Sequence, residues 1–321
     1  MKKLLGYVMV AGALLMAGGC QKEGSEGEVP ASVKTTFSVQ IPMEPQTKDV
    51  SKAEKTDIVY YEVWDEAFQQ RLFPYEASQE NFARVNGCAA EVIIDLVQDQ
   101  KFNLVFWAQN EACGAYSWDD LKKINVDYGK FTDDQKDVYD AFYAVLPDVE
   151  GDGQPKTVRL YRPFAQVNFC ATELQTTLGP ITLSGNTVTV SEVATTFNTR
   201  TGLGENPAAN VAFSTDAGFV EDQTIEVDSQ TFHWVAMNYL LVASAPVSGS
   251  APVEDPSVNV TVTADFVTNF GTVHHDVFNV PVQRNHRTNI VGDLFTTGAK
   301  LNIIVDPGFV KPDKPTIEIN N

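Results

Sequence analysis

Basic residues are scarce in this sequence, which has 23 Lys and Arg against 42 Asp and Glu and a formal net charge of −19. No basic run appears after Lys2 and Lys3. A surface that follows nucleic-acid phosphates needs clustered Lys and Arg, so we expect no nucleic-acid partner. Charged residues make up only 20% of the chain and aromatic residues 10%, which excludes disorder along its whole length.

The sequence also lacks the short motifs of common catalytic and cofactor sites. It contains no Gly-x-Ser-x-Gly elbow, no Walker loop, no Gly-x-Gly-x-x-Gly turn and no His-Glu-x-x-His motif. Its one histidine cluster is His274, His275 and Asp276, and neighbouring side chains of a strand point to opposite faces, so the two imidazoles cannot bind one ion. We therefore expect no metal, no cofactor and no enzymatic activity. The carboxylate-rich composition is the one feature that would favour an acid-dependent hydrolase.

Cysteine is rare, with four residues and no Cys-x-x-Cys spacing, which gives no sign of a redox dithiol or a zinc knuckle. Cys20 ends the N-terminal apolar stretch, so three cysteines remain, and an odd number leaves at least one thiol unpaired. We expect Cys88, Cys113 and Cys170 to be buried single thiols, with a bridge between Cys88 and Cys113 as the alternative.

The N-terminus has the plan of a secretory signal. Lys2 and Lys3 precede an uncharged stretch from Leu4 to Gly19, which is too short for a comfortable membrane span. The residues Ala17-Gly18-Gly19-Cys20 resemble a bacterial lipobox, although Ala17 stands where Leu or a β-branched residue is usual. We expect a signal peptide over residues 1–19, lipid (palmitate) on Cys20 and a flexible tether over 20–31. The alternative is an ordinary signal peptide cut near the glycine pair.

The rest of the chain is rich in β patterns, with short apolar or alternating runs separated by Gly, Asn, Asp and Pro. Two helices are expected, Asp133–Ala144 and Ser117–Ile124. Many short strands with little helix indicate an all-β fold of two domains, residues 32–156 and 157–321, divided behind the turn Gly151–Pro155. The expected strands are Val33–Ile41, Ile58–Trp64, Ala90–Val97, Phe102–Ala108, Val158–Phe169 (with Pro163 breaking its register), Ile181–Val193, Phe232–Val242, Val258–Val267, Val273–Val282, Thr288–Leu294 and Leu301–Val305.

Tryptophan gives the other hint of a binding site. Trp107 and Trp234 lie inside apolar runs, which is typical of core residues. Trp118, between Gly114 and Asp119, is the plausible exposed platform for stacking a sugar ring; packing in the core or at its rim is the alternative.

The chain contains the segments Asn103–Asn110, Asp140–Ala144, Arg162–Asn168, Ala236–Leu241, Pro281–Gly292 and Asp306–Phe309, in this order after the lipobox. Together they resemble the fimbrillin-type lipoproteins of Gram-negative gut and oral anaerobes, which are subunits of the type V pilus and their relatives. The similarity is greatest to a poorly characterised fimbrillin-like branch. It implies two β-sandwich domains of transthyretin-like character and no enzymatic activity.

The resemblance further implies a location on the cell surface, at the outer membrane or in a pilus, and other pilus subunits as partners. In such proteins an arginine-specific protease cuts after the first strand, and a strand of another subunit fills the groove that opens. Arg71 and Arg84 are the first arginines of this chain, and either could be cut; plain surface arginine is the alternative. Arg71 follows a strand-like stretch, whereas Arg84, within Asn81–Gly87, is expected in a loop. Ile317 and Ile319 mark a donor strand or a closing edge strand.

From these observations we expect a non-enzymatic surface lipoprotein that is a pilus subunit, or a pilus anchor or accessory protein, and that acts in adhesion through strand complementation. The rival hypothesis is an outer-membrane lipoprotein that binds a host or other glycan through Trp118.

Overall fold

The computed structural model describes residues 31–42, 55–74, 81–131, 136–172, 175–176, 179–215, 224–243, 257–295, 301–306 and 317–319. Nearly all of the regular structure in these ranges is β-strand, which confirms the predicted all-β class. The predicted signal peptide, Cys20 and the tether up to residue 30 lie outside the described residues.

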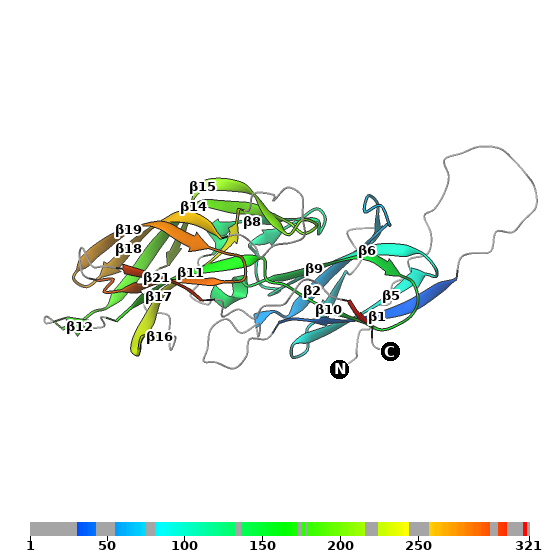
Figure 1. Cartoon of the computed structure of the whole chain (residues 1–321), viewed down its shortest axis with the longest axis horizontal. Coiled ribbons are helices and arrows are strands. Elements are labelled where there is room, and N and C mark those ends of the chain that lie inside the picture. Colours follow the sequence, from blue (N-terminus) through cyan, green and yellow to red (C-terminus); the bar gives the residue numbers. More distant parts are fainter. Residues whose placement is uncertain are drawn as a thin grey trace, which may run out of the picture.

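The N-terminal half is a sandwich of two sheets (Figure 1). Its strands are β1 (Ser32–Gln40), β2 (Ile58–Trp64), β3 (Arg71–Phe73), β4 (Phe82–Arg84), β5 (Ala89–Val97), β6 (Lys101–Gln109), β9 (Phe142–Glu150), β10 (Lys156–Arg159) and β22 (Ile317–Ile319). One sheet has the order β22-β10-β1-β5, and the other β3-β2-β6-β9 with β4 paired to β2. Buried side chains such as Phe37, Phe106 and Phe142 form the core of this half.

The C-terminal half is built on one large sheet with the central order β19-β18-β14-β17-β11-β20-β21. Strands β15 and β8 also pair with the long β14, β16 pairs with β17, and β7 pairs with β8. The bounds are β7 (Tyr116–Ser117), β8 (Lys123–Val126), β11 (Phe164–Ala171), β14 (Leu183–Asn198), β15 (Leu203–Thr215), β16 (Thr224–Val227), β17 (Gln230–Val242), β18 (Val258–Thr268), β19 (Gly271–Val282), β20 (Arg287–Gly292) and β21 (Leu301–Asp306), with a separate hairpin of β12 (Gln175–Thr176) and β13 (Gly179–Pro180).

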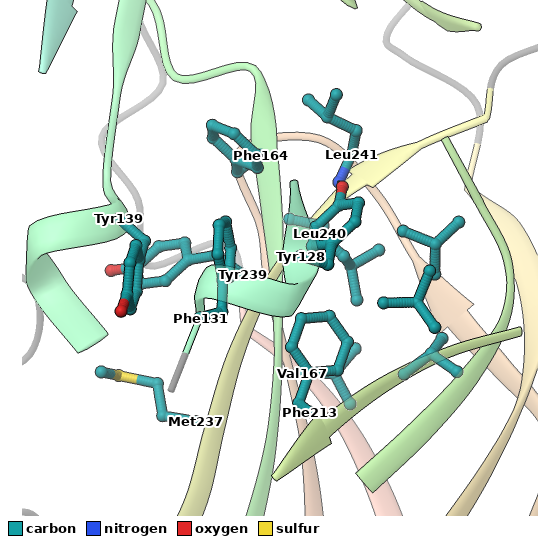
Figure 2. Close-up of a cluster of buried hydrophobic side chains, with 14 of the residues drawn as sticks. Tyr128, Phe131, Tyr139, Phe164, Val167, Phe213, Met237, Tyr239, Leu240 and Leu241 are labelled. Atoms are coloured by element: carbon teal, nitrogen blue, oxygen red, sulfur yellow. The ribbon is translucent and has the colours of Figure 1, made fainter. Parts of the chain in front are cut away.

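A segment of the first half packs into the core of the second (Figure 2). It carries the two short 3-10 helices, η2 (Tyr128–Lys130) and η3 (Lys136–Tyr139). The Phe131 and Tyr139 rings stack at 4.2 Å, and the Tyr128 hydroxyl donates to the Ala194 carbonyl at 2.9 Å. The same hydroxyl accepts from the Leu241 amide at 2.9 Å. The aromatic side chains of Tyr128, Phe131 and Tyr139 are therefore part of the C-terminal core.

Neither predicted helix extends over its expected range. Within Asp133–Ala144, Lys136–Tyr139 is the 3-10 helix η3, whereas residues 141–144 are all buried and Phe142 starts strand β9. Phe142 and Ala144 enter the N-terminal core while Ala141 and Tyr143 enter the large C-terminal cluster, so a strand buried on both sides replaces the helix. The range Ser117–Ile124 is instead the turn between β7 and β8.

The break at Pro163 is confirmed, because β10 ends at Arg159 and β11 begins at Phe164. Strand β10 belongs to the N-terminal sheet, whereas β7 and β8 are joined to β14 of the C-terminal sheet. The domain limits 32–156 and 157–321 stay a prediction.

Candidate functional site

The first described strand, β1, lies in the interior of its sheet. It pairs with β5 along its whole length, from Ser32 opposite Val97 to Gln40 opposite Ala89, and it runs parallel to β10 from Phe37 onward. Phe37 and Val39 are fully buried, because alternate side chains of a strand point into the core. Strand β1 therefore contributes both backbone pairing and core side chains to the N-terminal sandwich.

The turn before β10 fixes that strand beside β1. The Gly151 amide donates to the Gln100 carbonyl at 3.1 Å, and a Cβ at this position would lie 2.2 Å from the Val97 carbonyl oxygen. Only glycine fits so close to a neighbouring backbone. The buried Lys156 ammonium then binds both carboxylate oxygens of Asp152 at 2.9 Å.

The last described strand, β22, pairs with β10 in the same sheet, with Ile317 opposite Val158 and Ile319 opposite Lys156. Of the two predicted roles for this segment, the structure shows it in the place of an edge strand of the chain's own sheet. Its side chains lie outside the described residues. The first and last described strands are therefore separated by β10 alone, as the dark blue and red ends of the ribbon show (Figure 1).

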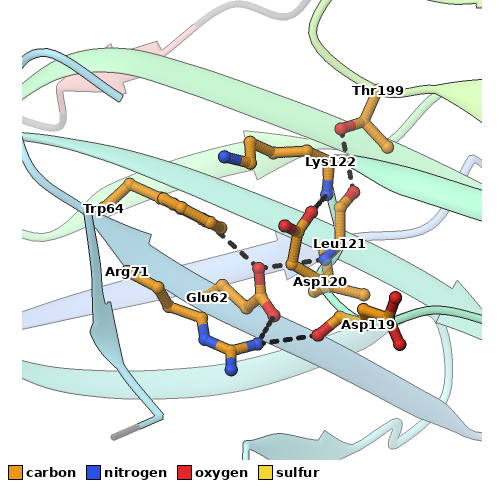
Figure 3. Close-up of polar contacts among 8 residues, drawn as sticks. All are labelled: Glu62, Trp64, Arg71, Asp119, Asp120, Leu121, Lys122 and Thr199. Atoms are coloured by element: carbon orange, nitrogen blue, oxygen red, sulfur yellow. Dashed lines mark hydrogen bonds and ion pairs between the residues drawn. The ribbon is translucent and has the colours of Figure 1, made fainter. Parts of the chain in front are cut away.

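Arg71, the first predicted processing site, belongs to a polar network at the outer face of β2 (Figure 3). Its guanidinium donates to the Glu62 carboxylate and to the Asp119 carbonyl, both at 3.0 Å. Glu62 is 1% exposed and also accepts from the Trp64 indole at 3.1 Å and from the Leu121 amide at 3.0 Å. Burial raises the pKa of Glu62, against the opposing effect of these donors.

The same network joins the two halves. The Thr199 hydroxyl donates to the Leu121 carbonyl at 2.9 Å, and the Lys122 ammonium lies 3.6 Å from the centre of the Trp64 ring. The β2 strand, the turn after β7 and the end of β14 are therefore linked through the residues around Glu62.

Arg84, the second predicted processing site, lies at the end of β4 and not in a loop, which corrects the expectation. It pairs opposite Ile58 of β2 and forms a two-point ion pair with Glu111 at 2.6 and 2.7 Å. The Arg84 side chain is 55% exposed. Cleavage at either arginine stays a prediction, and both positions follow β2, so a cut at either one would separate β1 and β2 from the rest of the chain.

A buried ion pair at the junction of the halves was missed by the sequence analysis. Arg162 binds Asp140 through two bonds of 2.7 Å, with side chains 3% and 1% exposed, and its guanidinium lies over the Phe142 ring. Arg284 donates to the Tyr143 hydroxyl at 2.9 Å. The signal was present in the sequence, since Asp140 and Arg162 are single charges that begin two otherwise uncharged segments, Asp140–Ala144 and Arg162–Asn168.

The described cysteines form no disulfide, and the neighbouring residues His274 and His275 have different partners. Cys88, Cys113 and Cys170 are free thiols, so the bridge between Cys88 and Cys113 is absent, and Cys88 is exposed where burial was expected. Burial raises the pKa of the Cys113 thiol to about 11, so it stays protonated at neutral pH. His275 is buried and bonds the Leu294 carbonyl at 2.6 Å, while exposed His274 lies 2.7 Å from Asp265, so the two rings lie in separate surroundings.

Trp107 and Trp234 are core residues, as predicted, with exposures of 0% and 1%. Trp118 is half-buried at the edge of the core and packs on Tyr60. Neither 3-10 helix among the described residues has the length and apolar character that a membrane span requires.

The fold and the site define a class: an all-β protein of two sandwich-like halves in which the N-terminal and C-terminal strands share one sheet. The chain belongs to DUF6562, a family of unknown function whose sequence profile matches residues 26–320. No curated protein matches it in sequence.

Comparison with solved structures finds proteins that resemble this chain. The chain is similar to a candidate cell adhesion protein from Bacteroides ovatus, with 15% identity, a TM-score of 0.52, and coverage of 88% of this chain and 100% of the other. It also matches the tip fimbrial protein Mfa3 from Porphyromonas gingivalis with 8% identity, a TM-score of 0.44, and coverage of 86% and 99%. A fimbrial assembly protein from Parabacteroides distasonis matches with 10% identity, a TM-score of 0.43, and coverage of 90% and 99%. Fimbrial and adhesion proteins are thus among the structures that this chain resembles, as its sequence predicted.

Proposed function

We propose that this chain is a non-enzymatic, lipid-anchored protein of the cell surface that serves as an anchor or accessory component of a pilus and acts in adhesion. The observation that carries the proposal is that β1 and β22 lie in one sheet, on either side of β10. Strands at the two ends of a chain are the ones that can be exchanged between subunits without rethreading the rest of the fold. The fold shared with the candidate adhesion protein of B. ovatus supports the same class.

The uncut role is favoured over that of a proteolysed shaft subunit. Cleavage at Arg71 or Arg84 would separate β2 as well as β1 from the chain, and β2 pairs with β3, β4 and β6. Loss of β1 and β2 together would remove an interior strand from each of the two sheets of the N-terminal sandwich. Arg71 is moreover held by Glu62 and the Asp119 carbonyl, which limits the access of a protease.

The anchoring is tested by the N-terminus of the mature protein. Full-length chain produced in a Gram-negative anaerobe is labelled with palmitate, and its N-terminal peptide is identified by mass spectrometry. We expect lipid on Cys20. The Cys20→Ala variant should carry no label and should no longer be found in the membrane fraction, and Cys88→Ala is the matched control. A mature end after Arg71 or Arg84 would contradict the uncut role.

Strand exchange is tested by locking β1 in place. Ser38 and Glu91 are opposite each other on β1 and β5 and both are exposed, so Ser38→Cys with Glu91→Cys can form a cross-strand disulfide. The Cys88→Ser substitution is included to remove the exposed native thiol. If β1 is the strand exchanged between subunits, the oxidised disulfide should prevent the protein from attaching to the pilus. If the exchange takes place at β22 and β10, attachment should be unchanged. Reduction with dithiothreitol restores the unlocked chain as an internal control. Attachment that also survives deletion of residues 317–321 would contradict strand complementation at this sheet.

A second candidate function, binding of a glycan, is favoured by the half-buried Trp118 beside Tyr60.

A further inference from the structure

Three aromatic rings from distant parts of the chain meet at the rim of the N-terminal half. Tyr60 of β2 lies between Trp118, at 5.0 Å and 66°, and Phe82 of β4, at 6.1 Å and 65°. Tyr60 and Phe82 are opposite each other in the β2–β4 register, so their side chains project from the same face. All three rings are half-buried, which leaves part of each in contact with solvent.

Planar charged groups flank these rings. The Arg84 guanidinium lies 5.4 Å from the centre of the Phe82 ring and is bound by the Glu111 carboxylate at 2.6 and 2.7 Å. The Glu111 amide donates to the Asp57 carboxylate at 2.7 Å, which brings a second acid to the group. Burial raises the pKa of Tyr60, and the carboxylates of Glu111 and Asp57 add to this effect while the Arg84 guanidinium opposes it.

Neighbouring residues fix the positions of Tyr60 and of the turn that carries Trp118. Tyr60 is opposite the fully buried Trp107 in the β2–β6 register, and Glu62, two residues further on, is fixed by its three donors. The turn that carries Trp118 is fastened by Arg71 at the Asp119 carbonyl and by the Asp120 carboxylate, which accepts from the Lys122 amide at 2.9 Å. A ligand would therefore meet rings and planar groups that are already ordered, which lowers the entropic cost of binding.

We propose that Tyr60, Phe82 and Trp118, with Arg84 and Glu111, form a binding site for a neutral carbohydrate. The proposal rests on the adhesive function proposed above and names its ligand class. A pyranose ring has an apolar C–H face that fits against aromatic rings, and a rim of hydroxyls that can donate to a carboxylate and accept from a guanidinium. Because Asp57 and Glu111 outnumber Arg84, a sugar acid would meet a net negative charge, and the site favours neutral sugars.

Calorimetry on the full chain carrying Cys20→Ser, which prevents lipid attachment, tests the proposal. The probes are the neutral hexasaccharides of mannose, xylose, β-1,4-glucose and N-acetylglucosamine, with polygalacturonate as the acidic probe. We expect at least one neutral probe to bind. Trp118→Ala should lower the affinity for that probe by about tenfold or more, because one ring contact is lost. The matched control is Phe278→Ala, which removes a ring that is 63% exposed on β19 in the other half and should leave the affinity unchanged.

The absence of binding to every neutral probe, binding to polygalacturonate alone, or an affinity that survives both Trp118→Ala and Phe82→Ala would each overturn the site. If Trp118→Ala unfolds the turn that carries it, Phe82→Ala, at the start of β4, makes the same test. Palmitate labelling of Cys20 and the β1–β5 disulfide lock do not depend on carbohydrate, so a failure of the site is distinguishable from a failure of the proposed function.

Discussion

Two arginine–carboxylate pairs of this molecule have nearly the same geometry and opposite surroundings. Arg162 binds Asp140 at the junction of the halves, with both side chains at most 3% exposed. Arg84 binds Glu111 at the rim of the N-terminal half, with side chains 55% and 49% exposed. Both are two-point contacts with N–O distances of 2.6–2.7 Å.

The difference lies in the solvent, because water screens the outer pair and would solvate either partner if the other were removed. The inner pair is shielded from water, so removal of one charge leaves the other buried without hydration. The outer pair is therefore available to a ligand at little cost in stability, while the inner pair holds β9 and the segment before β11 together.

The largest effect is expected from Arg162→Met, which leaves the Asp140 carboxylate buried without its partner. Removal of one member of a buried pair costs about 3–5 kcal/mol, measured as the free energy of unfolding in urea. The double variant Arg162→Met with Asp140→Leu removes both charges and should recover more than half of the loss. A single variant that is no less stable than Arg84→Gln would contradict the contrast between the two regions.

Glu62→Gln should have an intermediate effect. The amide oxygen still accepts from Trp64 and Leu121, but the amide nitrogen takes the place of the carboxyl oxygen that accepts from Arg71, at a cost of about 1–2 kcal/mol at pH 4.5. Because the pKa of Glu62 is raised from 4.5, its stabilising contribution is complete below pH 4.5 and is lost as the pH rises through the folded-state pKa. The difference between wild type and Glu62→Gln should therefore shrink from pH 4.5 to pH 7 in urea titrations; a difference that grows would contradict the raised pKa.

The strands that alternate apolar and polar residues were predictable from the sequence. Strand β18 keeps its period of two, with Val260, Val262 and Ala264 buried. The largely apolar run of residues 58–64 also forms a strand, β2, as expected. Strand β15, which contains Pro207 and several exposed residues, was missed because its partner β14 and not its own pattern decides its structure.

The error at β9 has a different origin. Residues 141–144, where this strand begins, are buried on both faces between two cores, so the run has no polar side and is also compatible with a helix. The ring group of Tyr60, Phe82 and Trp118 could not be assembled from the sequence either, since β-sheet register and the turn after β7 bring the three residues together. Trp118 alone was identifiable there.

Arg84→Gln should leave the melting temperature nearly unchanged, since both partners of this pair are half in solvent and each can be hydrated alone. The same variant should weaken binding of the neutral hexasaccharide by about threefold to tenfold, since one charged donor to a sugar hydroxyl is lost. Differential scanning calorimetry and titration calorimetry on one preparation measure the two effects. A melting point that falls as far as that of Arg162→Met would mean that the outer pair is structural after all.

The smallest effect is expected at His274, a second exposed pair that lies on the hairpin of β18 and β19. Its ring bonds Asp265 at 2.7 Å and Asp276 at 3.2 Å, and these bonds, Asp265 foremost, raise the pKa of His274 above its usual value of 6.5. The raised pKa means that its stabilising contribution is complete below pH 6.5 and is lost as the pH rises through the folded-state value. His274→Gln should therefore be slightly less stable than wild type at pH 5.5 and equal to it at pH 8.5. An NMR titration of the imidazole that gave a pKa below 6.5 would contradict the geometry, and because the ring is 54% exposed, even a confirmed shift should move the melting point far less than any change at the buried junction.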